Sequence, residues 1–330
     1  MHNKDINKKG VYLLEEKYNK EAIQRLNQRF SEEFRPEQIL VNENMSAHTT
    51  FRTGGMADLF VEIQNEEQLG KALKLLHAEG LSVLNRDFYL LGNGSNLLVS
   101  DSGIRGVVLH LSKEYSHIRV EGNTLVCEAG ATLAAIAKKA CASALSGFEF
   151  AAGIPGSLGG AIVMNAGAYG GEMREVVKYV KLMTPEGKII QKNTDEMHFG
   201  YRHSLLKEQP LIVLEAAIAL VPGEIANIQS RMEELAAKRR EKQPLEYPSA
   251  GSTFKRPEGY FAAKLIEDAG LRGAFVGGAQ VSEKHCGFVV NKNQASSSDV
   301  YALIQEIQKK VRESSGVNIE PEVIFIGSFG

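Results

Sequence analysis

Two glycine-rich stretches are the first part of this sequence whose residue types point to chemistry. One is 92-GNGSN-96, and the other is 151-AAGIPGSLGGAIVMNAGAYGG-171, which holds seven glycines. Glycine permits positive φ angles and lets a ligand approach the backbone without a Cβ in the way. Successive exposed N–H groups then form a concave anion site that suits a pyrophosphate. In the same stretches, Ser95, Asn96, Ser157 and Asn165 add side-chain donors.

Neither stretch matches a standard phosphate-binding fingerprint. There is no GxxxxGK[ST], which argues against a P-loop nucleotide hydrolase. In 92-GNGSNL-97 a leucine stands where a dinucleotide-binding GxGxxG has its third glycine. A single glycine loop is often only a tight turn between strands. Two such loops, about sixty residues apart and low in charge, instead favour a long diphosphate ligand held mainly by backbone amides.

The elements that must position these loops are predicted from hydrophobic periodicity. Asn65 with Gln68 is expected to open a helix that Gly80 ends, and 221-VPG-223 marks a boundary. The predicted helices cover 11–33, 66–79, 132–143, 225–244, 261–269 and 298–314. The predicted strands cover 57–63, 88–92, 106–111, 117–122, 124–130, 177–184, 187–192, 211–220, 287–291 and 322–327.

Length and composition narrow the class of protein. A chain of 330 residues is too long for one simple core, so two or three domains are expected. A net charge of -2 gives no support to a nucleic-acid partner. Three cysteines without a CxxC predict reduced structural thiols, with no metal site or disulfide framework. No stretch has the length of a membrane span or of a secretory signal, so a cytoplasmic protein without a membrane partner is expected.

Six short motifs follow one another along the chain: 49-TTFRTGG-55, 92-GNGSN-96, 153-GIPGSLGGAIVMNAGAYG-170, 201-YRHS-204, 251-GSTFKRP-257 and 321-PEV-323. In this order they resemble the UDP-N-acetylenolpyruvoylglucosamine reductases, also called UDP-N-acetylmuramate dehydrogenases. The resemblance covers about residues 40–327. Residues 277–291 contain no tyrosine-bearing insertion and resemble the shorter class of these enzymes.

The resemblance implies an α+β fold. Two small α/β subdomains would form an FAD-binding domain of the vanillyl-alcohol-oxidase/PCMH type, and a C-terminal α/β domain would close over the substrate. The expected division is a helical extension over 1–40, subdomains over 41–112 and 113–222, and a substrate domain over 223–330.

The activity implied is NADPH-dependent reduction, through tightly bound FAD, of UDP-N-acetylglucosamine enolpyruvate to UDP-N-acetylmuramate in peptidoglycan precursor synthesis. NADPH is a co-substrate, and a monomer is expected. The motifs carry over these cofactor-binding residues: Thr53, Gly54, Gly92, Asn93, Gly94, Ser95, Asn96, Gly153, Ile154, Pro155, Gly156, Ser157, Gly160, Asn165, Ala166 and Gly167.

Three residues match the catalytic group of the family. Hydride addition to an enolpyruvyl group builds negative charge toward the carboxylate, which a cation stabilises, and a proton donor completes the addition. By motif, Arg202 is the arginine at the substrate carboxylate, Ser252 the proton donor and Glu322 the catalytic glutamate. Outside these motifs the same residues would be read as a surface arginine, a turn serine and a strand-edge charge.

Substrate binding is expected from Tyr201, Lys242 and Lys255. Lys242 ends a basic run that begins at Lys238, and its alternative role is to complement the helix dipole on a solvated face. Arg256 stands where the family often has asparagine, which leaves the role of that position open. His285 and Cys286 lack further metal ligands nearby and are expected to be structural.

Two other functions are compatible with glycine loops of this kind. One is a flavin-dependent oxidase of the same broad fold, which would need no enolpyruvyl acceptor. The other is a non-catalytic protein that binds a nucleotide or a cell-wall precursor. Against both stand Arg202, Ser252 and Glu322, each within its motif.

Overall fold

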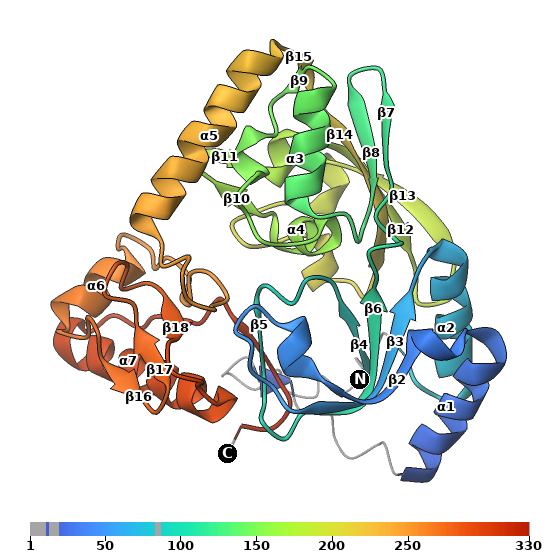
Figure 1. Ribbon diagram of the computed structural model, residues 1–330, viewed down its shortest axis with the longest axis horizontal. Coiled ribbons are helices and arrows are strands. Elements are labelled where there is room, and N and C mark those ends of the chain that lie inside the picture. Colours follow the sequence, from blue (N-terminus) through green and yellow to red (C-terminus); the bar gives the residue numbers. More distant parts are fainter. Residues whose placement is uncertain (1–10, 13–19, 83–86, 330) are drawn as a thin grey trace.

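The computed structural model describes residues 11–12, 20–82 and 87–329. Figure 1 shows three parts: a first subdomain (blue to teal), a second (green to yellow) and a C-terminal unit (orange to red). Helices are combined with one mainly parallel and one antiparallel sheet, so the predicted α+β class is confirmed.

The first subdomain is built on a four-stranded sheet of order β2-β3-β6-β4. Strand β2 pairs antiparallel with β3, whereas β3, β6 and β4 run parallel. Helices α1 and α2 lie against this sheet, as Figure 1 shows. The bounds are α1 Lys20–Glu33, β2 Ile39–Asn44, β3 Met56–Ile63, α2 Glu66–Ala78, β4 Phe88–Leu91 and β6 Ile104–Leu111.

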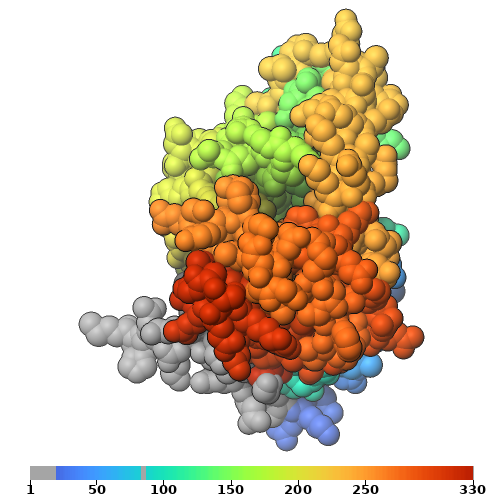
Figure 2. Space-filling view, turned by 90° about the vertical axis from the view of Figure 1, so that its left-hand side faces the viewer, coloured from blue at the N-terminus to red at the C-terminus, as the bar shows by residue number. Residues whose placement is uncertain are grey.

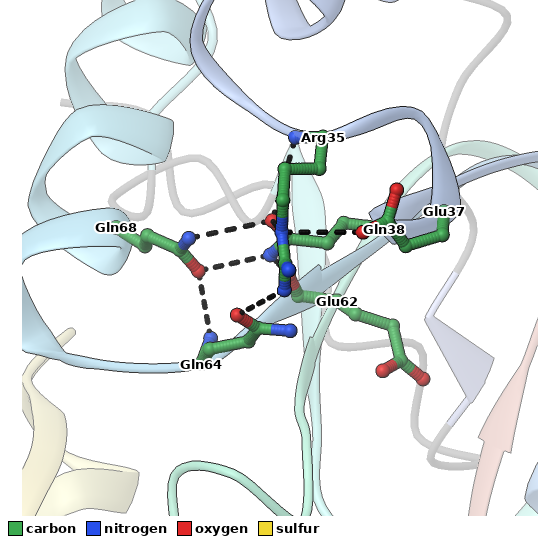
Figure 3. Close-up of polar contacts among 6 residues, drawn as sticks. All are labelled: Arg35, Glu37, Gln38, Glu62, Gln64 and Gln68. Carbon is green, nitrogen blue, oxygen red and sulfur yellow. Dashed lines mark hydrogen bonds and ion pairs between the residues drawn. The ribbon is translucent and has the colours of Figure 1, made fainter.

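A buried amide fixes the start of this sheet (Figure 3). Gln38 is 1% exposed, and its Nε2 donates to the Glu62 carbonyl at 2.7 Å and to Gln68 Oε1 at 3.0 Å. Asn65 caps α2 by accepting from the Gln68 N–H, as predicted, whereas Gln68 Oε1 accepts from the backbone of Gln64. One network therefore ties α2 to both β2 and β3.

The second subdomain is an antiparallel sheet of order β13-β12-β14-β8-β7. One hydrophobic core runs through this subdomain and the helix-covered face of the first. Its elements are β7 Ile118–Glu121, β8 Thr124–Glu128, α3 Leu133–Ala142, α4 Leu158–Met164, β12 Val177–Met183, β13 Ile189–Asn193 and β14 Ile212–Ala219. Short pairs complete it: β9 Leu145–Ser146 with β15 Val221–Pro222, and β10 Gly167–Ala168 with β11 Gly171–Glu172.

Helix α5 (Ile225–Lys242) packs along α3 and leads into the C-terminal unit. That unit contains α6 Ala262–Asp268, β16 Phe275–Val276, β17 Ala279–Val281, β18 Val289–Asn291 and α7 Ser297–Ser315. Its core includes Phe51 and Leu98 from the first subdomain. In the space-filling view of Figure 2, the orange-to-red unit lies directly below the green subdomain.

The last strand returns to the first subdomain. β19 (Ile324–Ile326) pairs in parallel with β5 (Leu97–Val99), and on its other side with β1 (Val11–Tyr12). The C-terminal residues therefore lie in a sheet beside the first glycine loop. Neither β5 nor this pairing was predicted from the sequence.

The helix predicted over 11–33 needs correction. Residues 11–12 form a strand and the helix starts at Lys20, while 13–19 lie outside the described residues. Apolar and charged residues alternate from residue 11 onward, so this pattern alone could not separate the strand at 11–12 from the helix.

Some general features of the described part of the chain bear on function. Its helices include none that is long and apolar enough to cross a membrane. Cys127, Cys141 and Cys286 are free thiols. In the same residues no cluster of histidine, cysteine and carboxylate side chains is arranged to hold a metal ion.

Candidate active site

The two glycine loops lie in contact. The first follows β4, and the second enters α4 through Ser157, whose Oγ accepts from the Gly160 N–H at 3.5 Å. A Cβ added at Gly92 would lie 2.2 Å from Ser157 Oγ, and one at Gly156 would lie 3.4 Å from Ser95 Oγ. At Gly92, at least, a side chain would push the two loops apart.

The first loop rests on the segment that carries the 49-TTFRTGG-55 motif. Gly94 has φ +57°, and a Cβ there would come within 1.9 Å of the His48 carbonyl oxygen. The Gly94 carbonyl accepts from the Thr50 N–H at 3.2 Å. Gly54 has φ +126°, and its Cβ would lie 2.9 Å from that of Val99. Glycine is thus required at both positions, for the angle and for the space.

The loops leave donors without protein acceptors. Among the described residues, the backbone N–H groups of 93–96, Gly153, Gly156 and Ser157 have no protein acceptor. The hydroxyls of Thr50 and Thr53 are buried and have no hydrogen-bond partner among the described residues. Buried polar groups normally find partners, so these atoms fit a ligand rich in acceptors, such as the pyrophosphate of FAD.

Some predicted cofactor residues also make contacts within the protein. The Asn165 side chain donates to Glu172 and to the Gly200 carbonyl, both at 3.1 Å, and accepts from the Arg174 N–H at 2.9 Å. With φ +42° this buried residue ends α4. Asn165, Ala166 and Gly167 therefore shape the turn after α4, and Ile154 closes the preceding turn by donating to the Ala151 carbonyl.

The three predicted catalytic residues come from distant segments. Arg202 Nε lies 2.5 Å from Glu322 Oε1, and the side chains are 25% and 11% exposed. The Nε–H does not meet hydrogen-bond geometry with any described residue, so the contact is an ion pair. Arg202 also has φ +52°, an unusual left-handed conformation for a non-glycine residue, of the kind that clusters at functional sites.

The segment that carries Ser252 is tied to the Glu322 segment by backbone pairing. Phe254 forms a bridge with Pro321, and the Glu322 N–H donates to the Thr253 carbonyl at 2.8 Å. Ser252 is exposed and stands one residue before Thr253. The structure thus brings the Ser252 segment beside Glu322, and Glu322 into contact with Arg202.

Burial and nearby positive charges act in opposite directions on the pKa of Glu322. Burial raises the pKa of this carboxyl, while the positive charges of Arg202, Lys207 and Lys255 lower it without cancelling the effect of burial. Burial lowers the pKa of Lys207, followed by the charge of Lys255, although its side chain keeps substantial solvent exposure. Sequence reasoning missed Lys207, although it stands five residues after Arg202 in 201-YRHSLLK-207.

Of the three predicted substrate residues, Tyr201 and Lys255 lie near this pair. Tyr201 is 59% exposed, and its hydroxyl accepts from the Arg256 N–H at 3.0 Å. The Arg256 guanidinium lies 4.0 Å from the centre of the exposed Phe261 ring. Lys255 Nζ lies 2.9 Å from Glu320 Oε2, and Lys242 is exposed at the end of α5.

Another residue of the basic run faces inward. Arg239 packs against the second glycine loop, because a Cβ at Gly153 would lie 3.1 Å from its Cδ. Burial lowers the pKa of Arg239. Its side chain lines a pocket of about 330 Å³ together with Tyr169 and Met232. Sequence reasoning had favoured Lys242 in this run.

His285 has a structural setting, as expected. Its Nδ1 accepts from the Gly287 N–H at 3.1 Å, and its ring packs edge-on against Phe288. Burial lowers its pKa.

Comparison with known proteins identifies the family. Residues 243–326 match the family model of the UDP-N-acetylenolpyruvoylglucosamine reductase C-terminal domain, and residues 57–192 match an FAD binding domain. The reductase of Agathobacter rectalis is 51% identical over 303 residues, which span 88% of this chain and 95% of the relative. That of Caldanaerobacter subterraneus is 50% identical, over 88% of this chain and 94% of the relative.

A solved structure agrees with these relatives. The crystal structure of UDP-N-acetylenolpyruvylglucosamine reductase from Thermus caldophilus has a TM-score of 0.74 and 32% identity, and the match covers 87% of this chain and 98% of that one. The two family models together cover both glycine loops, Ser252 and Glu322. The chain therefore belongs to the UDP-N-acetylenolpyruvoylglucosamine reductase family.

Proposed function

We propose that this chain is the FAD-containing, NADPH-dependent reductase that converts UDP-N-acetylglucosamine enolpyruvate to UDP-N-acetylmuramate. The observation that carries the proposal is the Arg202–Glu322 ion pair beside the Ser252 segment, next to a loop pair rich in unpartnered donors. The proposal includes a monomer that acts in the cytoplasm, as expected from the sequence.

The loop pair is the proposed cofactor site. The N–H groups of 93–96, Gly156 and Ser157, with the Thr53 hydroxyl, would hold the pyrophosphate of FAD. Bound there, FAD would carry the hydride from NADPH to the enolpyruvyl group. The loops themselves contribute binding and orientation, and their close contact helps to exclude water.

Each catalytic residue has a proposed task. Arg202 binds the substrate carboxylate and stabilises the negative charge that develops there. Ser252 gives its hydroxyl proton to the carbon next to the site of hydride addition. Glu322 holds Arg202 by charge. Burial raises the pKa of the Glu322 carboxyl, and the positive charges of Arg202, Lys207 and Lys255 act against this. Tyr201, Lys242 and Lys255 contact the substrate from the rim.

The test is Ser252→Ala, and Ser249→Ala, three residues earlier in the same segment, is the matched control. We expect the Ser252→Ala protein to keep FAD and to be reduced by NADPH, while turnover of the enolpyruvyl substrate falls by about 10²-fold or more. NADPH consumption and formation of UDP-N-acetylmuramate, followed by mass spectrometry, measure this. Equal turnover in the two variants would remove Ser252 from the mechanism.

A further inference from the structure

Asn96 connects the first glycine loop to Glu322. Its side-chain Nδ2 donates to the backbone carbonyl of Glu322 at 3.1 Å, across 226 positions of sequence. Its own carbonyl accepts from the Ile324 N–H at 2.9 Å, where β5 and β19 begin to pair. The loop that is left with free donors is thus tied directly to the segment of the buried carboxylate.

The backbone of Glu322 is held at both of its polar groups. Its N–H donates to the Thr253 carbonyl at 2.8 Å, and its C=O accepts from Asn96. Since a peptide unit is planar, bonds to the groups on either side of Cα restrict the direction of the side chain. That direction leads to Arg202.

We propose that Asn96 is a positioning residue. Its side-chain amide fixes the position of the Glu322 carboxylate relative to the cofactor loop. Binding of a ligand in the loop and correct placement of the carboxylate are therefore coupled. The inference rests on the proposed function, because it takes Glu322 as a catalytic residue. Binding of the cofactor itself is left to the backbone N–H groups of 93–96.

Loss of the Asn96 side-chain amide should lower the catalytic rate but leave the affinity for FAD nearly unchanged. The Glu322 carbonyl would lack its donor, and the segment around Pro321 and Val323 would shift. A displacement of about 1 Å at a catalytic group can cost on the order of 10²-fold in rate. Affinity for FAD would change little, because the donors that face the loop are on the backbone.

The experiment uses the full chain with Asn96→Leu and Asn96→Ala. Leucine keeps the branched shape of asparagine without a donor, so it carries the test if the alanine variant fails to load FAD. Asn227→Ala is the matched control, since the exposed Asn227 side chain donates a similar bond to Glu224 at 3.1 Å. FAD affinity is measured by titrating the apoprotein, and the two half-reactions are followed separately by flavin absorbance.

We expect the Kd for FAD to change by less than about threefold and bleaching by NADPH to proceed near the wild-type rate. Return of the flavin colour on addition of the enolpyruvyl substrate should slow by roughly 10- to 100-fold. Hydrogen exchange gives an independent readout: FAD should protect residues 320–326 in the wild type and in Asn227→Ala, but much less in Asn96→Leu.

Other outcomes overturn the inference. These are wild-type colour return in the loaded Asn96→Leu protein, equal slowing of both half-reactions, or loss of FAD binding by both Asn96 variants. If the wild type itself is not reoxidised by the substrate, the proposed function fails. The exchange experiment then still decides whether Asn96 links the loop to Glu322.

Discussion

At the scale of single residues, the Arg202–Glu322 ion pair is the main feature of the proposed active site. A planar guanidinium can contact the glutamate and a substrate carboxylate at once, whereas an ammonium acts as a point charge. We therefore expect Arg202→Lys to keep FAD but to lose about 10²-fold in turnover of the enolpyruvyl substrate. Steady-state kinetics measure this.

A matched control for Arg202→Lys exists elsewhere on the surface. Arg105 Nη1 lies 2.9 Å from Asp58 Oδ1 in an ion pair of the first subdomain. Arg105→Lys should leave turnover unchanged. Similar losses in the two variants would show that the effect at Arg202 is not specific to the site.

A second residue-scale prediction concerns pH. His110 packs near Phe60 and faces Glu62 and His48, the latter paired with Glu43. Burial lowers the pKa of His110 below its ordinary 6.5, and the His48 charge adds to this, against the opposite effect of Glu62. A histidine with a lowered pKa contributes stability that is present above its ordinary pKa and lost as pH falls through its folded pKa.

We therefore expect His110→Phe to reduce the loss of Tm between about pH 7.5 and about pH 5.5. Thermal unfolding at several pH values measures this. His77→Gln, an exposed position on α2, should keep the wild-type pH dependence. An unchanged slope in His110→Phe would show that this imidazole does not limit acid stability.

At the scale of elements, the first glycine loop makes a sharp prediction. Gly94→Ala would place a Cβ 1.9 Å from the His48 carbonyl, whereas Gly122, with a similar φ of +60°, has open space around it. Both variants incur backbone strain of about 1–2 kcal/mol, but only Gly94→Ala must move its loop. We expect Gly94→Ala to lose FAD and Gly122→Ala to retain it, as flavin content after purification would show. Retention by both would contradict the assignment of the loop.

The helices and strands also show which parts of the fold can be predicted from the sequence. The long periodic helices α2, α3, α5 and α7 were predicted within a few residues, because amphipathic patterns over several turns are strong signals. The three-residue strands β5 and β19 pair across most of the chain, and no local pattern reports such a partner. β19 was predicted as a strand, but its place beside the cofactor loop became known only from the fold.

The residues of the candidate site likewise divide into those that the sequence predicted and those that it did not. Motif order predicted Arg202, Ser252 and Glu322, and the fold brings Arg202 against Glu322 with the Ser252 segment alongside. Lys207 and Arg239 were not predicted, because the type of a basic residue gives no sign of what its side chain faces. Side-chain direction, which decides their roles, depends on packing rather than on local sequence.

At the scale of the whole molecule, the cofactor would bind between two subdomains that share one hydrophobic core, close to a C-terminal unit that has its own. The proposed site uses loops from both subdomains, and β19 connects it to the C-terminal unit. A ligand that binds only the folded chain stabilises it by about 2.7 kcal/mol at a free concentration of 100 times Kd. We expect FAD to raise the Tm of the apoprotein as one cooperative transition.

Riboflavin is the control for this measurement, because it lacks the phosphates that the backbone N–H groups would hold. Calorimetry should show little shift with riboflavin at the same concentration. An equal shift with both ligands would mean that the loops do not act as a pyrophosphate site.

The most direct test of the central claim is anaerobic flavin spectroscopy of the wild-type protein. NADPH is added first, and UDP-N-acetylglucosamine enolpyruvate second, while the flavin absorbance is followed. The account predicts bleaching by NADPH and return of the yellow colour with the enolpyruvyl compound, with UDP-N-acetylmuramate as product. Bleaching without return would contradict the proposed acceptor, and a protein that takes up no FAD would contradict the cofactor site itself.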